Sequence, residues 1–182
     1  QALYPELRTE VTIGKSAVIE QHILENKIDI GLIENQSEHP DINVLPFMED
    51  YMQAVVAPDH PLAGCSQVTL EQLAQYPFLM REKGSAGREI LDACFALEQI
   101  TVHPLWESAS TQAIVRGVAE GLGVAVLPCL LVRKNIEEHT VKMIPFPQPL
   151  TRKLNLIWHR SKYLTDNMNA FIELCKKSGS EW

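Results

Sequence analysis

Hydrophobic positions along the chain form short apolar runs that alternate with stretches of helical periodicity. Residues Ile28–Ile33 and Val124–Leu127 have the length and composition expected of buried strands. Near the C-terminus, Thr165 is placed to cap a helix, and apolar residues recur from Met168 at i, i+3, i+4 and i+7. Repeated alternation of strands and helices predicts a protein of the α/β class.

The stretch from Glu107 to Pro128 predicts a helix followed by a strand. Three residues near its beginning carry the hydroxyl groups that cap helix starts: Ser108, Ser110 and Thr111. Apolar residues at four-residue spacing mark the expected buried face of the helix: Ile114, Val118 and Leu122. Gly121 is placed to end the helix in a left-handed conformation, and Val124–Leu127 then predicts a parallel strand covered on both faces. A helix start with several hydroxyls favours an anion.

Other segments predict further strands and a linker. Arg8–Ile13 alternates between polar and β-branched residues, which is typical of a strand. Val44–Phe47 and Met52–Ala57 predict two separate strands, and Leu154–Trp158 predicts the last one. Three prolines between residues 145 and 149 indicate a linker.

Gly14, Lys15 and Ser16 interrupt the strand pattern and begin a helix predicted to reach about Glu25. Gly-Lys-Ser occurs in nucleotide-binding phosphate loops, but that motif requires a glycine five residues before Gly14, where Thr9 stands. The nucleotide loop is therefore rejected. Two interpretations of Ser16 remain, an ordinary helix cap and a ligand contact.

A second glycine-containing loop, Lys83–Gly87, leads into a helix predicted from Arg88 to about Leu97. Gly84 lets the backbone approach a ligand, and Ser85 with Lys83 or Arg88 provides donors for an anion. The alternative is a capped helix with exposed basic residues.

Composition describes an ordinary globular chain of 182 residues, 46% hydrophobic and 21% charged. The formal net charge of −7 argues against a chain that grips nucleic acid by itself. The sequence contains no apolar run long enough to span a bilayer, so no membrane partner is expected.

The cysteines and histidines form no pattern typical of a metal site. Four cysteines, at positions 65, 94, 129 and 175, are far apart without a C-x-x-C motif, and are expected to be reduced, although a redox-sensing pair stays open. The six histidines form no i, i+4 pair and no H-E-x-x-H. Common catalytic motifs such as G-x-S-x-G are also absent from the sequence, so neither a metal nor an enzyme activity is predicted.

Four stretches of the sequence together resemble one known family. They are RGVAEGLGVAVLP at residues 116–128, Asn26–Leu32, Ala57–Ala63 and Arg81–Glu89. In their order and spacing, they resemble the effector-binding domain of LysR-type transcriptional regulators. The similarity runs from about Tyr4 to Leu174.

The resemblance implies two Rossmann-like lobes with crossing hinge strands, as in type 2 periplasmic binding proteins. Lobe I would comprise residues 1–54 and 152–182, and lobe II residues 55–151. By comparison with the family, the first strand of lobe I is missing from this sequence. The family's N-terminal winged helix-turn-helix is also not in this chain.

The resemblance further implies a binding site for a small, anionic metabolite between the lobes, with no cofactor. Residues near helix starts and strand ends would hold it: Lys15, Ser16, Glu34, Gly84, Ser85, Ala86, Ser108, Ser110 and Thr111. Glu34, which precedes Asn35 at the end of a predicted strand, has an alternative role as a solvated loop carboxylate. A cytoplasmic homodimer or homotetramer that contacts DNA through the N-terminal domain is expected.

Two other classes of function stay open at this point. A two-lobed solute-binding protein of a transport system shares the implied fold, but four widely spaced cysteines and the AEGLGVAVLP stretch favour the regulator. An enzyme on the same architecture, such as a dehydratase or deaminase, would need a cleft acid or base with a strongly perturbed pKa.

Overall fold

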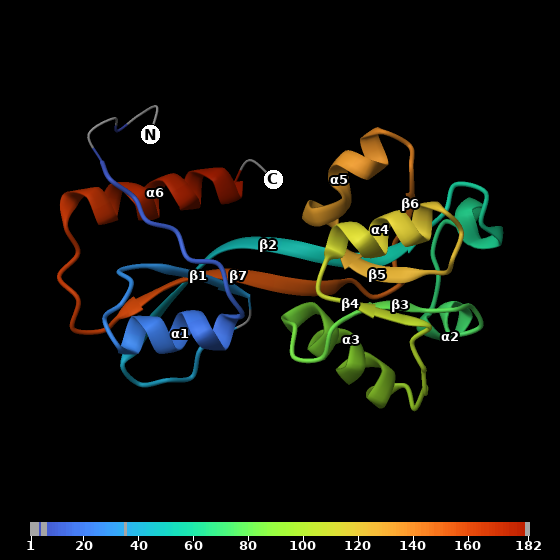
Figure 1. The fold of residues 1–182 in the computed structure, drawn as a ribbon, viewed down its shortest axis with the longest axis horizontal. Helices are drawn as coiled ribbons and strands as arrows, with labels where there is room; N and C mark the ends of the chain where they lie inside the picture. The colour runs from blue at the N-terminus through green and yellow to red at the C-terminus, as the bar shows by residue number, and fades with distance from the viewer. Residues whose placement is uncertain (1–3, 5–6, 35, 181–182) are drawn as a thin grey trace.

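Two long antiparallel strands run through the molecule and connect its two ends (Figure 1). They are β2 (Ile42–Val56) and β7 (Leu150–His159). The computed structural model describes residues 4, 7–34 and 36–180 of the chain. Asn35, expected beside Glu34 at a strand end, lies outside the described residues.

One end of the molecule, lobe I, gathers elements from both termini of the chain around the adjoining parts of β2 and β7 (Figure 1). These elements are α1 (Ser16–Leu24), β1 (Gly31–Glu34) and α6 (Asp166–Ser180). Isoleucines of α1, β1, β2 and β7 form a core cluster here: Ile19, Ile23, Ile33, Ile42 and Ile157. Lobe I therefore has a hydrophobic core of its own.

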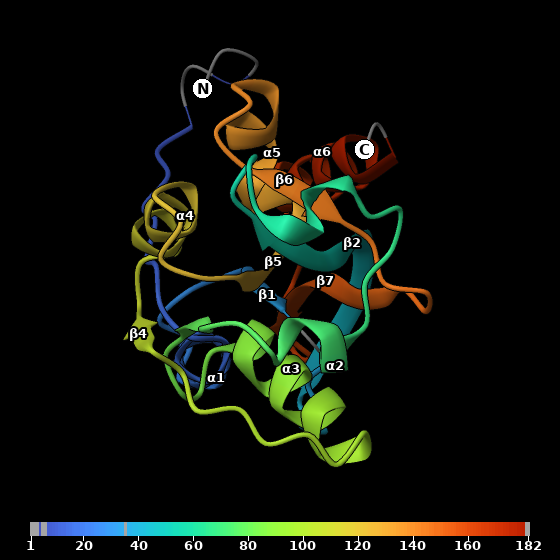
Figure 2. The same ribbon diagram turned by 90° about the vertical axis from the view of Figure 1, so that its right-hand side faces the viewer.

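The other end, lobe II, is built from the middle of the chain. Its elements are a short 3₁₀ helix η1 (Pro61–Gly64), α2 (Leu70–Leu73), β3 (Leu79–Arg81), α3 (Ala86–Leu97), β4 (Trp106–Ser108), α4 (Thr111–Ala119), β5 (Ala125–Pro128), α5 (Cys129–Glu137) and β6 (Lys142–Ile144). Figure 2 shows α2 and α3 on one side of β5 and α5 on the other. Two further core clusters lie in this lobe, one around Phe78 and Leu73 and one around Ile114 and Leu127.

The main sheet is antiparallel and crosses from one lobe to the other. Its strand order is β1-β7-β2-β5, and β6 pairs with β2 on the edge opposite β5, beyond the end of β7. A second, two-stranded sheet joins β3 and β4 in parallel. Because β2 pairs with strands of both lobes and β7 pairs alongside it, the two strands form the hinge between the lobes, as the resemblance implied. The predicted lobe boundaries at residues 54/55 and 151/152 stay a prediction.

Several local predictions are confirmed by the structure. Ser110 caps α4 by accepting a hydrogen bond from Ala113 N at 3.2 Å, and Thr165 accepts one from Met168 N at the start of α6. Gly121 follows α4 with φ +74°, the left-handed conformation that favours glycine. The α/β class is confirmed as well.

Three strand predictions are corrected. Arg8–Ile13 is fully exposed and forms no strand, because no neighbouring strand in the described part of the chain pairs with it. The two strands expected at Val44–Phe47 and Met52–Ala57 are one strand, β2, with an irregularity between Pro46 and Met48 that accounts for the break in the pattern. The buried strand β5 pairs with β2 antiparallel rather than parallel. The parallel pairing at this position is limited to a single bridge between Phe78 and Val124, the residue before β5.

Two predictions about helix residues are also corrected. Leu122 is 52% exposed, because α4 ends at Ala119 and the turn after it leaves the buried face. Ser16 is the first residue inside α1 rather than its cap, and Lys15 occupies the capping position without a side-chain cap hydrogen bond. None of the helices in the described residues combines the length and apolar character needed to cross a membrane.

Candidate effector-binding cleft

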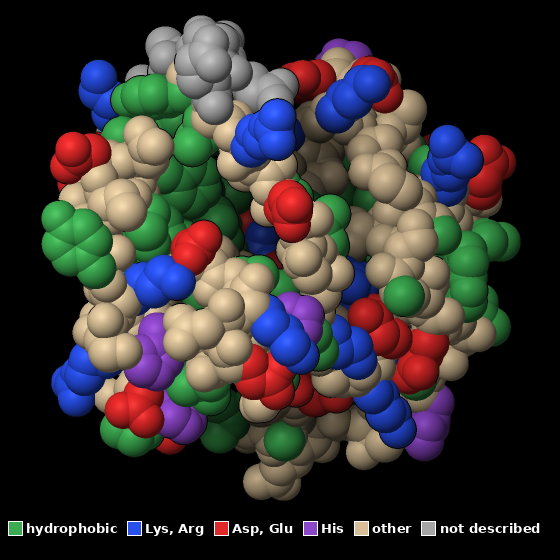
Figure 3. Space-filling model, turned by 60° about the vertical axis from the view of Figure 1, so that its left-hand side comes forward, with side chains coloured by type: hydrophobic (Ala, Val, Ile, Leu, Met, Phe, Trp, Pro, Cys, Tyr) green, Lys and Arg blue, Asp and Glu red, His purple; other side chains and the backbone are tan. Residues whose placement is uncertain are grey.

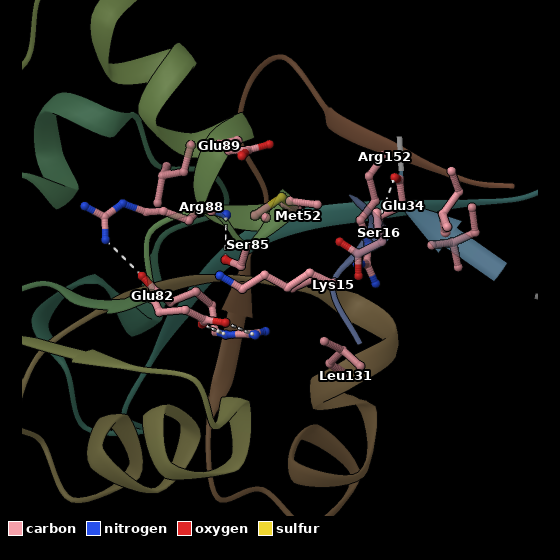
Figure 4. A pocket seen from close by; sticks show the side chains of 18 of the residues that line it. Lys15, Ser16, Glu34, Met52, Glu82, Ser85, Arg88, Glu89, Leu131 and Arg152 are labelled. Carbon is pink, nitrogen blue, oxygen red and sulfur yellow. Dashed lines mark hydrogen bonds and ion pairs between the residues drawn. The ribbon is translucent and has the colours of Figure 1, made fainter. Parts of the chain in front are cut away.

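A cleft of about 660 Å³ lies between the lobes and is lined from both of them. Lobe I contributes the start of α1 and the end of β1, and lobe II contributes the loop after β3 and the first turn of α3 (Figure 4). Six predicted site residues line it: Lys15, Ser16, Glu34, Gly84, Ser85 and Ala86. The structure thus brings together residues that are up to 71 positions apart in the sequence, from Lys15 to Ala86.

The N-terminus of α1 forms the lobe I wall of this cleft. The hydroxyl of Ser16 donates a hydrogen bond to the carbonyl oxygen of Glu34 at 3.3 Å, which ties the helix start to the end of β1. Backbone N–H groups in the first turn of a helix have no partner within the helix. With a basic residue at the capping position and the positive end of the helix dipole, this wall favours an anion.

The N-terminus of α3 forms the opposite wall. Ser85 is 8% exposed and caps the helix by accepting a hydrogen bond from Arg88 N at 3.4 Å. Gly84 has φ +78°, so the loop turns sharply before the cap. The Lys15 ammonium donates to the carbonyl oxygen of Lys83 at 3.4 Å and bridges the two walls. Both predicted loops therefore meet across the cleft.

Two arginines near the α3 wall are already paired with carboxylates. Arg81 contacts Glu82 through Nε and Nη2 at 2.9 and 3.2 Å, and Arg88 contacts Asp92 and Glu107, each at 2.8 Å. Burial disfavours the charged form of Arg88, but its hydrogen bonds to Glu107 and Asp92 outweigh this and raise its pKa. These contacts order the loop before α3, and both arginines are part of the cleft lining.

The Glu82 carboxyl shows the same balance of effects. Burial raises its pKa, but the hydrogen bond from Arg81 together with the nearby Lys15 charge outweighs burial, so the net pKa is lowered. Glu82 is therefore ionised at neutral pH. Lys15 has no ion-pair partner within 4 Å among the described residues, which leaves its charge available to a ligand.

Three charged residues on three adjacent strands lie at the floor of the cleft, with Asp50 beneath the lining. Arg152 of β7 contacts Glu34 of β1 at 2.6 Å and Asp50 of β2 at 2.7 Å. The side chains of Arg152 and Asp50 are 3% and 2% exposed. Burial of an ion pair requires further hydrogen bonds, and Asp50 receives them from Tyr51 N and Leu130 N at 2.8 and 3.4 Å.

Apolar side chains make up much of the remaining lining of the cleft, beside Glu20, Gln36 and Glu89. Aliphatic, aromatic and methionine side chains from both lobes line it: Ile13, Leu32, Phe47, Met52, Met80, Leu91, Val126, Leu131 and Leu154. A concave, mostly apolar pocket with a few polar groups is typical of small-molecule binding sites.

Figure 3 shows basic and acidic side chains interspersed over the lobe I face, without the single-sign surface expected of a nucleic-acid site.

Three predicted site residues lie apart from the lining of this cleft. Ser108 accepts a hydrogen bond from Ser110 N, and Ser110 caps α4 at a separate surface depression beside Trp106. Thr111 accepts a hydrogen bond from Arg81 Nη1 at 3.0 Å, so it touches a residue of the cleft wall. Ligand binding by any of the predicted residues stays a prediction.

Asp50 and Arg152 are not among the site residues predicted from the sequence. Both lie just outside the strands predicted from the sequence, and each is buried because the observed strands β2 and β7 extend further. One signal was present: Arg152 shares the i, i+2, i+4 phase of Leu154 and Leu156, which places it on an inward face of β7. Its partner on β2 could not be identified without the strand register.

Cysteines and possible metal ligands do not form a second site in the part of the chain that the structure describes. No group of three or more His, Cys, Asp or Glu side chains is arranged to hold a metal ion there. The four cysteines are free thiols, and Cys65 is exposed. Burial raises the pKa of the Cys94, Cys129 and Cys175 thiols, which lowers their reactivity.

Comparison with known proteins agrees with this architecture. The regulatory domain of Synechocystis PCC6803 CcmR, solved in complex with 2-PG, superposes with a TM-score of 0.88 at 23% identity, covering 98% of this chain and 86% of that chain. The effector-binding domain of QuiR in complex with shikimate gives a TM-score of 0.78 at 23% identity, covering 92% of this chain and 79% of that chain. These similarities confirm the predicted fold.

Sequence comparison identifies the family. The chain is 34% identical over 173 residues to the uncharacterized HTH-type transcriptional regulator YeiE of Escherichia coli (strain K12), which covers 94% of the chain and 59% of the relative. The chain thus spans about three fifths of the length of this curated relative. Relatives of this kind are named as transcriptional regulators, which agrees with the prediction that the chain is not an enzyme. The sequence model of the LysR substrate binding domain matches residues 1–180, so this chain belongs to the family of LysR substrate binding domains.

Proposed function

We propose that the chain is the effector-binding domain of a LysR-type transcriptional regulator and binds a small anionic metabolite in the cleft between its lobes. The observation that carries this proposal is the meeting of two helix N-termini, those of α1 and α3, across the cleft with Lys15 between them. Unpaired N–H groups and the positive ends of two helix dipoles favour an anion, and the ammonium adds a full charge. The bound small molecules named for the CcmR and QuiR domains support a ligand here.

Binding in this position has a direct route to a change in lobe arrangement. A ligand that contacts both helix starts interacts with both lobes at once, whereas the hinge strands β2 and β7 connect the lobes from behind. An arrangement in which both walls touch the ligand is then stabilised relative to a more open one. The ligand shifts the equilibrium only by its difference in affinity for the two arrangements.

We further infer that this change controls DNA binding through a part of the regulator outside these residues. Relatives of the chain are longer and are named HTH-type regulators, and the net charge of −7 makes this domain a poor partner for DNA by itself. Altered pairing between subunits of a homodimer or homotetramer would reposition the DNA-binding parts on the operator. A cytoplasmic location follows from this role.

Thermal unfolding in the presence of small carboxylic acids and oxyanions tests the proposal. A ligand at a hundred times its Kd stabilises the folded domain by about 2.7 kcal/mol. This raises the unfolding midpoint by several degrees in a domain of this size. A shift with neutral or cationic compounds, and none with anions, would contradict an anion site.

Variants of the cleft walls make the test specific. Lys15→Ala removes a charge that has no carboxylate partner among the described residues. It should weaken anion binding by about tenfold or more, the loss expected when one hydrogen bond from a charged group is removed. Ser16→Ala should weaken binding with little loss of fold, and Thr111→Ala should act more weakly through Arg81. The matched control is Lys134→Ala, an exposed lysine on α5. Equal losses for Lys134→Ala and Lys15→Ala would indicate a nonspecific charge effect instead.

A further inference from the structure

Three charged groups at and beneath the floor of the cleft leave it locally negative. Asp50 and Arg152 neutralise one another, and Glu34 adds a second carboxylate through its Oε1, 2.6 Å from Arg152 Nη1. The buried pair cannot reorganise easily, because both its members are nearly inaccessible and Asp50 is further fixed by two backbone N–H groups. Glu34 is therefore held in place from below.

The open side of Glu34 faces the cleft. Its side chain is 35% exposed and lines the cleft, and its shortest contact with Arg152 is made through Oε1. A part-exposed carboxylate that is positioned by an ion pair keeps acceptor capacity for a donor group of a ligand. Little ordering cost is added on binding, since the ion pair has already fixed the side chain.

Lys15 and the start of α3 lie away from this acceptor, whose basic neighbour is Arg152. In Figure 4 the Lys15 side chain extends from the α1 start toward Ser85 and Glu82, whereas Glu34 lies with Arg152 on the other side of Ser16. A ligand whose anionic group is bound between Lys15 and the α3 start therefore directs its far end toward Glu34. The cleft separates a site for negative charge from a site for a hydrogen-bond donor.

We infer that Glu34 is a specificity-determining residue and that the ligand is an acid with a hydroxyl or ammonium group at the end remote from its anionic group. This inference rests on the proposed anion site. A second anionic group at the far end would meet the Glu34 carboxylate and be repelled. An apolar end would cover that carboxylate without providing a hydrogen bond, which also weakens binding.

Four acids of equal chain length separate these cases. Butyrate, 4-hydroxybutyrate, 4-aminobutyrate and succinate share one carboxylate and differ in the group at the other end. We expect calorimetric titration of the wild-type domain to give about tenfold tighter binding for the hydroxyl and ammonium compounds than for butyrate, and the weakest binding for succinate. Glu34→Gln should remove most of the preference for the ammonium compound and improve succinate binding.

Two further variants control this experiment. Glu38→Gln removes an exposed carboxylate outside the cleft lining and should leave the order of affinities unchanged. Glu34→Asp keeps the charge but withdraws it by one methylene, so it should retain the penalty on succinate and lose the preference for donors. Glu34→Asp also provides a readout if Glu34→Gln does not fold.

The possible outcomes distinguish the two proposals. If the wild type binds these acids without a preference among their far ends, Glu34 does not determine specificity, although the anion site stands. Tightest binding of succinate would also overturn the inference and indicate that a ligand carboxylate replaces Glu34 on Arg152. If no acid binds the wild type or any variant, the anion site fails and the inference fails with it.

Discussion

Asp50 and Arg152 face one another directly in the register of β2 and β7 and form a buried ion pair, with Arg152 Nη2 2.7 Å from Asp50 Oδ2. They lie where the two strands pass between the lobes, beneath the cleft. Because Arg152 also contacts Glu34 of β1 and Asp50 accepts from Leu130 N of α5, this pair connects the cleft floor to elements of both lobes.

Asp50→Asn should destabilise the domain strongly. The change leaves the buried Arg152 guanidinium with Glu34 as its remaining carboxylate, and loss of one partner of a buried pair costs about 3–5 kcal/mol. Chemical denaturation should report this loss in the free energy of unfolding. The control is Glu49→Gln, the exposed neighbour of Asp50 on β2, which should change stability by less than about 0.5 kcal/mol. Equal effects of the two substitutions would show that the pair contributes nothing specific.

Gly123→Ala should be poorly tolerated. A Cβ at Gly123 would lie 2.2 Å from the carbonyl oxygen of Pro77, and that oxygen already accepts a hydrogen bond from Val124 N at 2.8 Å. Because the carbonyl belongs to the backbone and is held by this hydrogen bond, relieving the clash requires the segment before β3 to move away from β5. We expect this movement to cost about 1–3 kcal/mol.

Gly64→Ala is the matched control for that substitution. No atom lies within 4 Å of a Cβ at this position. The free energy of unfolding should therefore change by less than about 1 kcal/mol, with stabilisation expected from the reduced freedom of the unfolded chain. An unfolding midpoint for Gly123→Ala equal to that of Gly64→Ala would contradict the close approach.

Ser110→Ala should weaken the start of α4. The substitution removes the cap that accepts from Ala113 N, which costs about 1 kcal/mol. In a domain of this length the unfolding midpoint should fall by about 2–4 °C. Ser66→Ala, in an exposed loop, should leave the midpoint unchanged. A cleft ligand should bind Ser110→Ala normally, because Ser110 is separate from the cleft lining.

The four thiols should differ in their rates of alkylation. Burial raises the pKa of Cys94, Cys129 and Cys175, with the Asp50 charge adding to the effect at Cys129, so their thiolate fraction at neutral pH is below that of an ordinary thiol. Cys65 is exposed and should react first with iodoacetamide in a time course followed by mass spectrometry.

The alkylation rates of the three slower cysteines should begin to rise at a higher pH than that of a solvent-exposed thiol. The reason is that their thiolate forms appear at higher pH. Cys65→Ser provides the control, since it should remove the fast phase and leave the slow phase intact. Labelling of Cys129 before Cys65 at pH 7 would be inconsistent with the burial of Cys129.

Local predictions succeeded where neighbouring residues decide the structure. The caps at Ser110 and Thr165 and the left-handed turn at Gly121 each depend on contacts within four residues. Strand pairing was predicted less well. The alternation of Arg8–Ile13 is compatible with a strand, but a strand also needs a partner, and none lies beside it in the described residues.

The sequence by itself determined the α/β class, the family and the two hydroxyl- and glycine-bearing loops, because periodicity, capping and a shared motif order are properties of the chain read along its length. The tertiary structure alone decided which of these loops share a cleft. It placed Ser16 and Ser85 on facing walls, left Ser110 outside, and buried Arg152 between Asp50 and Glu34. The physical reason is that β2 and β7 set the register between segments about a hundred residues apart, and register between distant strands depends on packing of the whole domain.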